Sequence, residues 1–213
     1  DRFLDFVERC PGYDVYFINP LPQKSYFHFN VWEQGEACHP GISALTQELF
    51  AWLGYTVDVS QIGRHDQKNL LYCNYWIGNE KFWDSYMSFL YPLFDYATRQ
   101  SSSELHERLF SPTHYHRPAP MFPFIFERLF STFLSIHPEI RVIGYRHSVA
   151  EIEQCCLTDL EAYIIRTMRD VVDQWDLECE YSQERRQIFK ALGQAVQKYD
   201  ELFFSIEGHP YET

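Results

Sequence analysis

Several short stretches of this sequence carry side chains that could bind or convert a polar ligand. The stretch "WEQGEACHPG" places Trp32, Glu33, Cys38 and His39 close together. A carboxylate, a thiol and an imidazole at this spacing could hold zinc, or the thiol and the imidazole could act as nucleophile and base. Neighbours in sequence rarely point at one another, however. We predict a polar loop over 33–41, with ligand binding by Trp32, Glu33 and His39 as the functional alternative.

A second stretch, "LLYCNYWI", sets Asn74 among aromatic residues. Its amide could bond a neighbouring backbone group, or it could offer donors and an acceptor to the vicinal hydroxyls of a sugar. In the second case Tyr72, Tyr75 and Trp76 would cover the apolar face of the sugar ring. The stretch therefore allows either a packed core with one polar group or a sugar-binding groove.

The stretch "FIFERLF" contains Glu127 and Arg128 between apolar residues. A carboxylate in such surroundings is costly to bury without a partner. Glu127 therefore either forms a structural pair with Arg128 or serves as general base for an acceptor hydroxyl. If the protein catalyses sugar transfer, a cation such as Arg128, Lys24 or Arg117 would offset the negative charge of the diphosphate.

The stretch "HYHRP" would place His114 and His116 on one face of an extended segment. Metal sites use this spacing, but no third ligand with convincing spacing follows, so we predict no metal ion and no cofactor. We expect residues 99–120 to form a long loop that acts as a lid. In that role Arg117 and the two histidines could cover a phosphate.

The composition argues against several classes of protein. The 213 residues have a formal net charge of −12 and no run of Lys and Arg, which argues against binding of nucleic acid or of a membrane surface. No apolar run reaches the roughly 18 residues of a membrane span, so we expect no transmembrane segment. The six cysteines lack CxxC spacing, and we predict reduced thiols and a cytoplasmic location. Aromatic residues make up 18%, which favours a well-packed core or carbohydrate binding.

Hydrophobic periodicity predicts the scaffold that must position these side chains: an α/β body over 1–148 followed by a helical hairpin over 149–213. The helix from about 80, capped by Asn79, is apolar nearly all round and should be buried. The expected strands are 13–18, 70–77 and 139–145, with weaker candidates at 24–32 and 56–62, and the expected helices of the body are 42–55, 80–97 and 123–136.

The last part of the chain has a different character, because it is charged and almost free of Gly and Pro. Apolar residues recur at steps of three and four over 150–175 and over 182–204, so each segment should form an amphipathic helix. Two such helices with a short join should form an antiparallel hairpin. We expect the hairpin to pack partly on the body and partly on a second copy or partner domain, through 150–205.

The order "YCNYWIGNEKFWDSYMSFLYPLF", a variable loop and "FPFIFERLFSTFL" resembles the second half of glycosyltransferases of bacterial capsule and O-antigen assembly. The segment "NVWEQGEACHPG" is also similar to a loop of these proteins, and the resemblance covers about 13–145. It implies a GT-A fold, in which a Rossmann-like mixed sheet flanked by helices binds a nucleotide sugar. It also implies that Asn74 lies on the acceptor side and that Glu127 points into the site.

One motif of that family is missing. GT-A enzymes typically carry Asp-x-Asp at the end of a central strand, where it holds a metal against the diphosphate. Here "YDVYFINP" ends in Asn19 and Pro20, and Asp14 lies at the start of the strand. The enzyme would therefore work without a metal, lack an N-terminal part of the fold, or no longer catalyse transfer.

Two functions follow as hypotheses. The first is transfer of a sugar from a nucleotide-sugar donor to a growing cell-surface polysaccharide. The alternative is a non-catalytic glycan-binding or scaffolding module of a larger polysaccharide-synthesis protein, and a weaker third hypothesis is a metal hydrolase. We expect the site to be one cleft at the edge of the sheet. Its predicted ligand-binding residues are Trp32, Glu33, His39, Asn74, Tyr75 and Arg128, with Glu127 as the catalytic residue.

Overall fold

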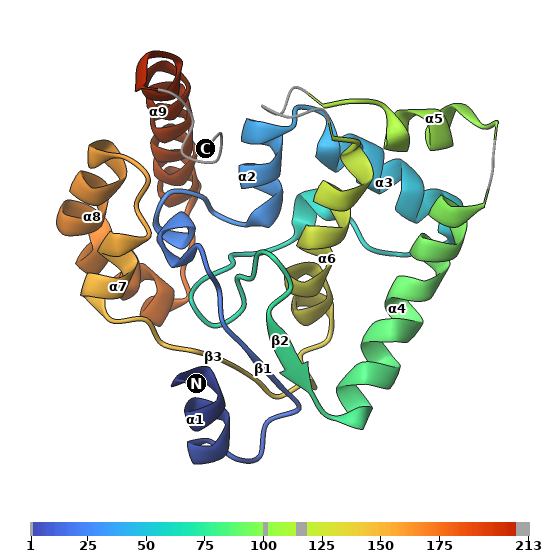
Figure 1. The fold of residues 1–213 in the computed structure, drawn as a ribbon, viewed down its shortest axis with the longest axis horizontal. Coiled ribbons are helices and arrows are strands. Elements are labelled where there is room, and N and C mark those ends of the chain that lie inside the picture. Colours follow the sequence, from blue (N-terminus) through green and yellow to red (C-terminus); the bar gives the residue numbers. More distant parts are fainter. Residues whose placement is uncertain (1, 100–101, 114–118, 208–213) are drawn as a thin grey trace.

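Helices dominate the computed structural model, which describes residues 2–99, 102–113 and 119–207 (Figure 1). The strands are β1 (Val15–Phe17), β2 (Trp76–Gly78) and β3 (Val142–Gly144). The helices of these described ranges are α1 (Arg2–Arg9), α2 (Val31–Cys38), α3 (Ile42–Leu53), α4 (Glu80–Thr98), α5 (Glu104–Phe110), α6 (Met121–Ile136), α7 (Val149–Gln154), α8 (Asp159–Glu178) and α9 (Gln183–Glu207), with short 3-10 helices η1 (Pro22–Tyr26) and η2 (Val59–Gln61).

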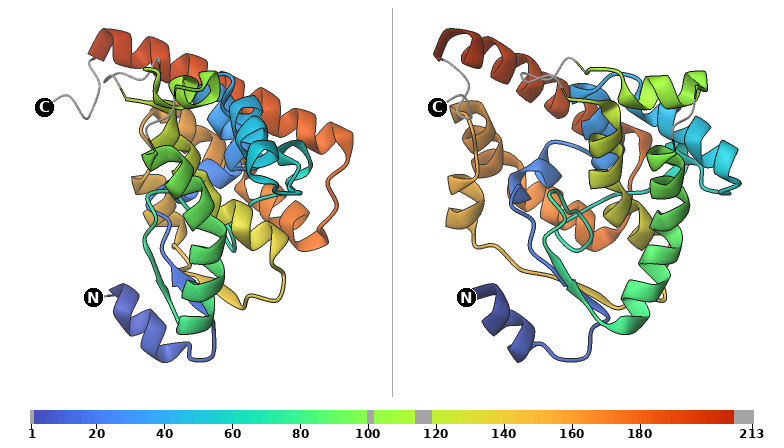
Figure 2. Two further views of the ribbon diagram at one scale, coloured as in Figure 1. Left: turned by 90° about the vertical axis from the view of Figure 1, so that its right-hand side faces the viewer. Right: turned by 45° about the vertical axis from the view of Figure 1, so that its right-hand side comes forward.

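The predicted GT-A-like α/β fold is wrong. The described residues form a mostly helical structure with one small sheet, in the order β2-β1-β3. Strand β1 pairs antiparallel with β2 and parallel with β3. In Figure 1 helices α7, α8 and α9 stand on one side of this sheet and α3, α4 and α5 on the other. The two views of Figure 2 place α1 at one end of the molecule and α9 at the other.

The segment 24–32 is not a strand, because local signals make it helical. Pro22 starts η1, and Asn30 caps α2 by accepting hydrogen bonds from the backbone N–H groups of Trp32 and Glu33 at 3.0 and 2.9 Å. The predicted loop over 33–41 is wrong for the same reason, since most of it belongs to α2.

The segment 70–77 is extended only at its end, where β2 begins. Three backbone N–H groups before β2 bond to side chains instead of a neighbouring strand. Leu71 donates to Ser131 Oγ at 3.0 Å, Tyr72 to Asn19 Oδ1 at 3.4 Å and Cys73 to Glu127 Oε1 at 3.1 Å. With these donors occupied, the chain turns at 72–75 and pairs with β1 only from Trp76 onward.

Three helices lie where the periodicity predicts them, at α3, α4 and α6. The predicted cap of α4 is confirmed, because Asn79 Oδ1 accepts from the N–H of Phe82 at 2.9 Å. The prediction that α4 is buried all round is wrong. Its outer face exposes Trp83, Tyr91 and Phe94.

Two hydrophobic cores hold the helices together. The larger core joins the sheet to α2, α3, α4, α5 and α6. The second core joins Tyr26, Phe27 and Phe29 to apolar side chains of α7, α8 and α9, among them Ile165 and Phe189. The amphipathic stripes of α8 and α9 therefore pack on η1 and the residues after it, in addition to packing on each other.

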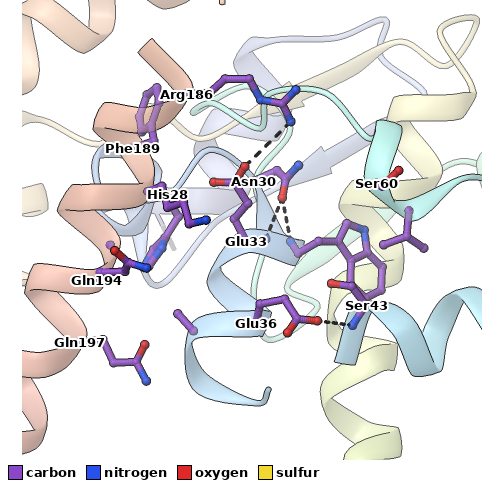
Figure 3. Close-up of a pocket in the computed structure, with 15 residues that line it drawn as sticks. His28, Asn30, Glu33, Glu36, Ser43, Ser60, Arg186, Phe189, Gln194 and Gln197 are labelled. Carbon is purple, nitrogen blue, oxygen red and sulfur yellow. Dashed lines mark hydrogen bonds and ion pairs between the residues drawn. The ribbon is translucent and has the colours of Figure 1, made fainter. Parts of the chain in front are cut away.

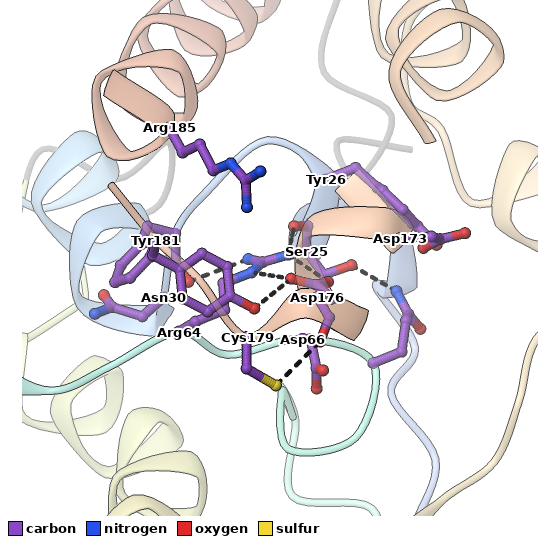
Figure 4. A network of polar contacts seen from close by, with 12 residues as sticks. Ser25, Tyr26, Asn30, Arg64, Asp66, Asp173, Asp176, Cys179, Tyr181 and Arg185 are labelled. Carbon is purple, nitrogen blue, oxygen red and sulfur yellow. Dashed lines mark hydrogen bonds and ion pairs between the residues drawn. The ribbon is translucent and has the colours of Figure 1, made fainter. Parts of the chain in front are cut away.

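Arg64 lies at the centre of the polar network in Figure 4 and links η1 and the residues after it to helix α8. Its guanidinium forms two bonds to Asp176, at 3.0 and 3.1 Å. It also donates to the backbone carbonyls of Ser25, His28 and Phe29, at 2.6, 2.7 and 3.1 Å. The Arg64 side chain is only 4% exposed, so these contacts are shielded from water. One arginine thus fixes η1 and the residues after it against α8.

Replacement of Arg64 by Met should destabilise the protein strongly. The substitution removes the cationic partner of Asp176 and the guanidinium donor of the Ser25 and His28 carbonyls, whereas the carbonyl of Phe29 still accepts from the N–H of His65. Loss of one partner of a buried pair costs about 3–5 kcal/mol, which urea denaturation would measure. The double variant Arg64→Met/Asp176→Leu should lose less free energy of unfolding than the sum of the losses in the variants Arg64→Met and Asp176→Leu. A single-variant loss below about 1 kcal/mol would contradict this role.

Asp14 ties the three strands together at the start of β1. Its carboxylate accepts from Arg141 N at 2.9 Å and from Asn79 Nδ2 at 3.0 Å, on either side of the strand. The hydrogen bonds and charge of Arg141, followed by those of Asn79 and Lys81, hold the pKa of this carboxyl well below its ordinary value. Asp14 therefore stays ionised in the folded protein at any pH near neutral.

This lowered pKa predicts acid sensitivity. Because the pKa of the Asp14 carboxyl is lower in the folded than in the unfolded state, its ionisation contributes fully to the free energy of unfolding at neutral pH. This contribution is lost as the pH falls below about 4. Asp14→Asn should therefore lower stability at pH 7 and show a smaller further loss on acidification than the wild type. Denaturant titrations at several pH values would measure both effects. Asp170→Asn, at a carboxylate on the surface of α8, is the control and should keep the wild-type dependence.

Candidate functional site

An aromatic hollow of about 310 Å³ lies where the 72–75 turn and β2 meet α4 and α6. We call it the aromatic shelf. The rings of Trp76 and Trp83 lie 4.6 Å apart between centroids and are inclined by 56°. Trp83 is 46% exposed, so part of its indole is open to solvent. The shelf is lined by Asn74, Trp76, Trp83, Tyr86, Leu90 and Phe126.

The turn that carries Asn74 has an uncommon backbone. Cys73 and Asn74 have φ angles of 63° and 55°, in the left-handed region that non-glycine residues rarely adopt. Asn tolerates this conformation better than Cys does, and each such residue costs about 1–3 kcal/mol. The surrounding structure must therefore hold the turn, and backbone strain of this kind clusters at functional sites.

Glu127 supplies that support. Its Oε1 accepts from the N–H of Cys73 at 3.1 Å and from the Cys73 thiol at 3.6 Å. The Glu127 side chain is 28% exposed. Glu127 therefore holds the turn next to Asn74 and still reaches solvent.

Arg128 is occupied by protein partners. It donates to the carbonyls of Val31 and Phe124, at 2.9 and 2.6 Å, and to the side-chain oxygen of Gln34. Its side chain is 2% exposed. A Cβ atom at Gly35 would lie 2.6 Å from Arg128 Nε, so this glycine makes room for the guanidinium. Arg128 therefore joins α6 to α2, and the same contacts keep it away from any ligand.

Trp32 and Glu33 face a different hollow, the α2–α9 pocket, with a volume of about 550 Å³ (Figure 3). Trp32 is buried, and its Nε1 donates to Thr132 Oγ1 at 3.0 Å. Burial raises the pKa of Glu33, against the opposing charge of Arg186. The nearest guanidinium nitrogen of Arg186 lies 3.9 Å from Glu33 Oε1.

The remaining predicted site residues, His39 and Tyr75, line neither hollow. His39 is buried and stacks on Phe124 at 3.8 Å between ring centroids, and burial together with Arg128 lowers its pKa to about 4. Tyr75 is 57% exposed beside Asn74. In the predicted lid, α5 packs against α3 and α6. His114, His116 and Arg117 lie outside the described residues.

The structure thus brings together only part of the predicted cleft. Asn74 lines the aromatic shelf and Glu127 bonds to the adjoining Cys73, whereas Trp32 and Glu33 line the α2–α9 pocket. Sequence reasoning missed Trp83 and Phe126 on the shelf, and the α9 side chains that close the pocket. The surplus of aromatic residues on α4, beyond one buried stripe, is the signal that could have indicated an exposed platform.

No protein-family model, no curated protein and no solved structure matches this chain.

Two further features bear on the kind of site. Among the described residues, no three His, Cys, Asp or Glu side chains are grouped so that they could hold a metal ion. Within those same ranges, every helix is too short or too polar to cross a bilayer. The candidate sites therefore rest on aromatic rings, amides and paired charges.

Substitution of Glu127 should separate its structural role from any chemical one. Glu127→Ala leaves the Cys73 N–H without an acceptor on a strained turn, and should lower the free energy of unfolding by about 1–3 kcal/mol. Glu127→Gln keeps an acceptor oxygen at the same place and should cost less than about 1 kcal/mol. Chemical denaturation of both variants tests this, and equal stability of Glu127→Ala and wild type would disprove the support of the turn.

Proposed function

We propose that this protein binds a glycan on the aromatic shelf. The observation that carries the proposal is the half-exposed indole of Trp83 set beside Trp76, with the amide of Asn74 lining the same hollow. Aromatic faces cover the C–H faces of sugar rings, and an amide offers both donors and an acceptor to hydroxyls. The volume of about 310 Å³ lies at the lower end for small-molecule sites.

The strained turn supports the same function. A left-handed Asn74 costs free energy, and the hydrogen bond from Cys73 to Glu127 maintains the adjoining backbone. The amide is therefore held in place before a ligand arrives, which lowers the entropic cost of binding. The aromatic side chains of the shelf are likewise fixed, because Trp76 packs against Phe82 and Tyr86.

Sugar transfer is the second candidate, and one observation favours it. Glu127 is partly exposed and bonded to the residue next to Asn74, so its carboxylate lies near the shelf. As general base it would take the proton of an acceptor hydroxyl while that oxygen attacks the anomeric carbon of the donor sugar, and the bond from this carbon to the diphosphate breaks with release of the nucleoside diphosphate. The partners would then be a nucleotide sugar and the glycan acceptor of a cell-surface polysaccharide.

Two further expectations belong to this proposal. A second copy or partner domain would bind through 150–205, since α8 and α9 expose Tyr163, Leu177, Leu202 and Ile206 to solvent. A cytoplasmic location would suit the six cysteines, which are free thiols in the structure.

Binding of glycans to variants of the shelf tests the first candidate. Trp83→Ala should weaken binding of the best ligand from a glycan array by about tenfold or more, because it removes an aromatic face. Trp52→Ala is the matched control, since Trp52 is 62% exposed on α3 and lines neither hollow. Asn74→Gly keeps the left-handed backbone accessible and removes the amide, so it should weaken binding without loss of stability.

The outcomes separate the two candidates. If Trp83→Ala and Trp52→Ala bind alike, the shelf is not the glycan site. If Glu127→Gln binds the glycan normally but loses transfer from nucleotide sugars that the wild type supports, the second candidate is correct. If the wild type transfers no sugar from any donor tested, the function is glycan binding alone.

A further inference from the structure

The α2–α9 pocket has the size and wall chemistry of a second binding site. Its volume of about 550 Å³ falls in the range of small-molecule sites. Figure 3 shows Phe189, Gln194 and Gln197 along α9 on one side and Ser43 and Ser60 across from them, with Glu33 and Glu36 between. Polar groups thus converge from α2, α9 and the segments around Ser43 and Ser60.

His28 is a polar ring in this pocket without a protein partner. It is 7% exposed and lines the pocket, yet its ring bonds to none of the residues that the structure describes. Burial, and then the charges of Lys24, Arg128 and Arg64, lower the pKa of His28 to about 3, so the imidazole is neutral. A neutral imidazole has one donor and one acceptor. Because the ring lines the pocket and makes no hydrogen bond to the described residues, its nitrogens are free to bond to a ligand there.

Gly193 allows α9 to approach the ring. A Cβ atom at this position would lie 2.6 Å from His28 Nδ1 and 3.2 Å from the carbonyl oxygen of Phe27. Glycine is unfavourable in a helix interior relative to alanine, so its presence here suits the close packing. The close contact between Gly193 and His28 sets the position of the α9 wall.

Two cations on α9 face the same space. Arg186 and Lys190 are separated by one helical turn, and both line the pocket. The contact of Arg186 with Glu33, at 3.9 Å, is too long for a hydrogen bond. Within the ranges described, Lys190 is within ion-pair distance of no carboxylate. The carboxylate of Glu36 is already occupied, because it accepts from the N–H groups of Gly41 and Ser43 at 2.9 and 2.8 Å.

We propose that the α2–α9 pocket binds a small hydroxylated anion, such as a sugar acid or a sugar phosphate. Arg186 and Lys190 bind the anionic group. His28, Gln194 and Glu33 bind hydroxyl groups, and Phe189 and Trp32 supply apolar surface. This site is separate from the aromatic shelf and does not depend on the proposed glycan binding.

Isothermal titration calorimetry of the full chain tests the proposal with four probes: glucuronate, glucose 6-phosphate, inorganic phosphate and glucose. At least one of the two hydroxylated anions should bind more tightly than glucose, which lacks the charge, and than phosphate, which lacks the polyol. The difference in affinity between glucuronate and glucose 6-phosphate shows whether the site prefers a carboxylate or a phosphate. Binding should weaken as salt rises, because part of the attraction is between charges.

Matched variants locate the binding. Lys190→Gln should weaken it by about tenfold or more, whereas Lys198→Gln, an exposed lysine of α9 outside the pocket, should leave it unchanged. His28→Phe should also weaken binding, and circular dichroism checks that it folds. Trp83→Ala should have no effect here, so failure of this site is distinguishable from failure of the shelf. Equal effects of the two lysine variants, or no binding of either hydroxylated anion, would overturn the proposal.

Discussion

The contact between Arg64 and the segment 22–30, which comprises η1 and the residues after it, is the constraint on which the rest of the arrangement depends. This segment has no neighbouring strand, so its carbonyl groups need another donor. Arg64 gives hydrogen bonds to three of them and pairs with Asp176 of α8. Its guanidinium also lies 4.3 Å from the centroid of the Phe189 ring of α9. One planar side chain with several donors can serve all these partners, and a lysine could not.

The position of this segment then determines both the second core and the α2–α9 pocket. The side chains of Tyr26, Phe27 and Phe29 pack against α7, α8 and α9, whereas His28 lines the pocket. A second buried pair, Lys24 with Glu161 at 2.6 Å, attaches the same segment to α8. Asp200 of α9 lies near this pair, and burial and the charge of Glu161 raise its pKa to about 6. The helical part is therefore joined to the body through 22–30, by the second core and by the buried pairs Lys24–Glu161 and Arg64–Asp176.

The sequence predicts the long helices well because their signals are local. Periodicity locates α3, α4 and α6, and Asn79 is recognisable as a cap. The GT-A-like fold could not be rejected from the sequence, because short aromatic runs suit strands and buried helices equally. The turn at 72–75 depends on Asn19, Ser131 and Glu127, which are remote in sequence. Asn74 was therefore recognised by its aromatic neighbours, but the residues of α4, α6 and α9 that complete the two hollows were not.

The bond between Cys73 and Glu127 also bears on redox chemistry. Cys73 lies on the surface, where a cysteine would normally be open to oxidation and alkylation. Burial of its sulfur and the neighbouring carboxylate raise the pKa of the thiol to about 11. The reactive form is the thiolate, and at pH 7 only about one molecule in ten thousand would carry it. The carboxylate that holds the strained turn thereby also makes the protein chemically durable at this position.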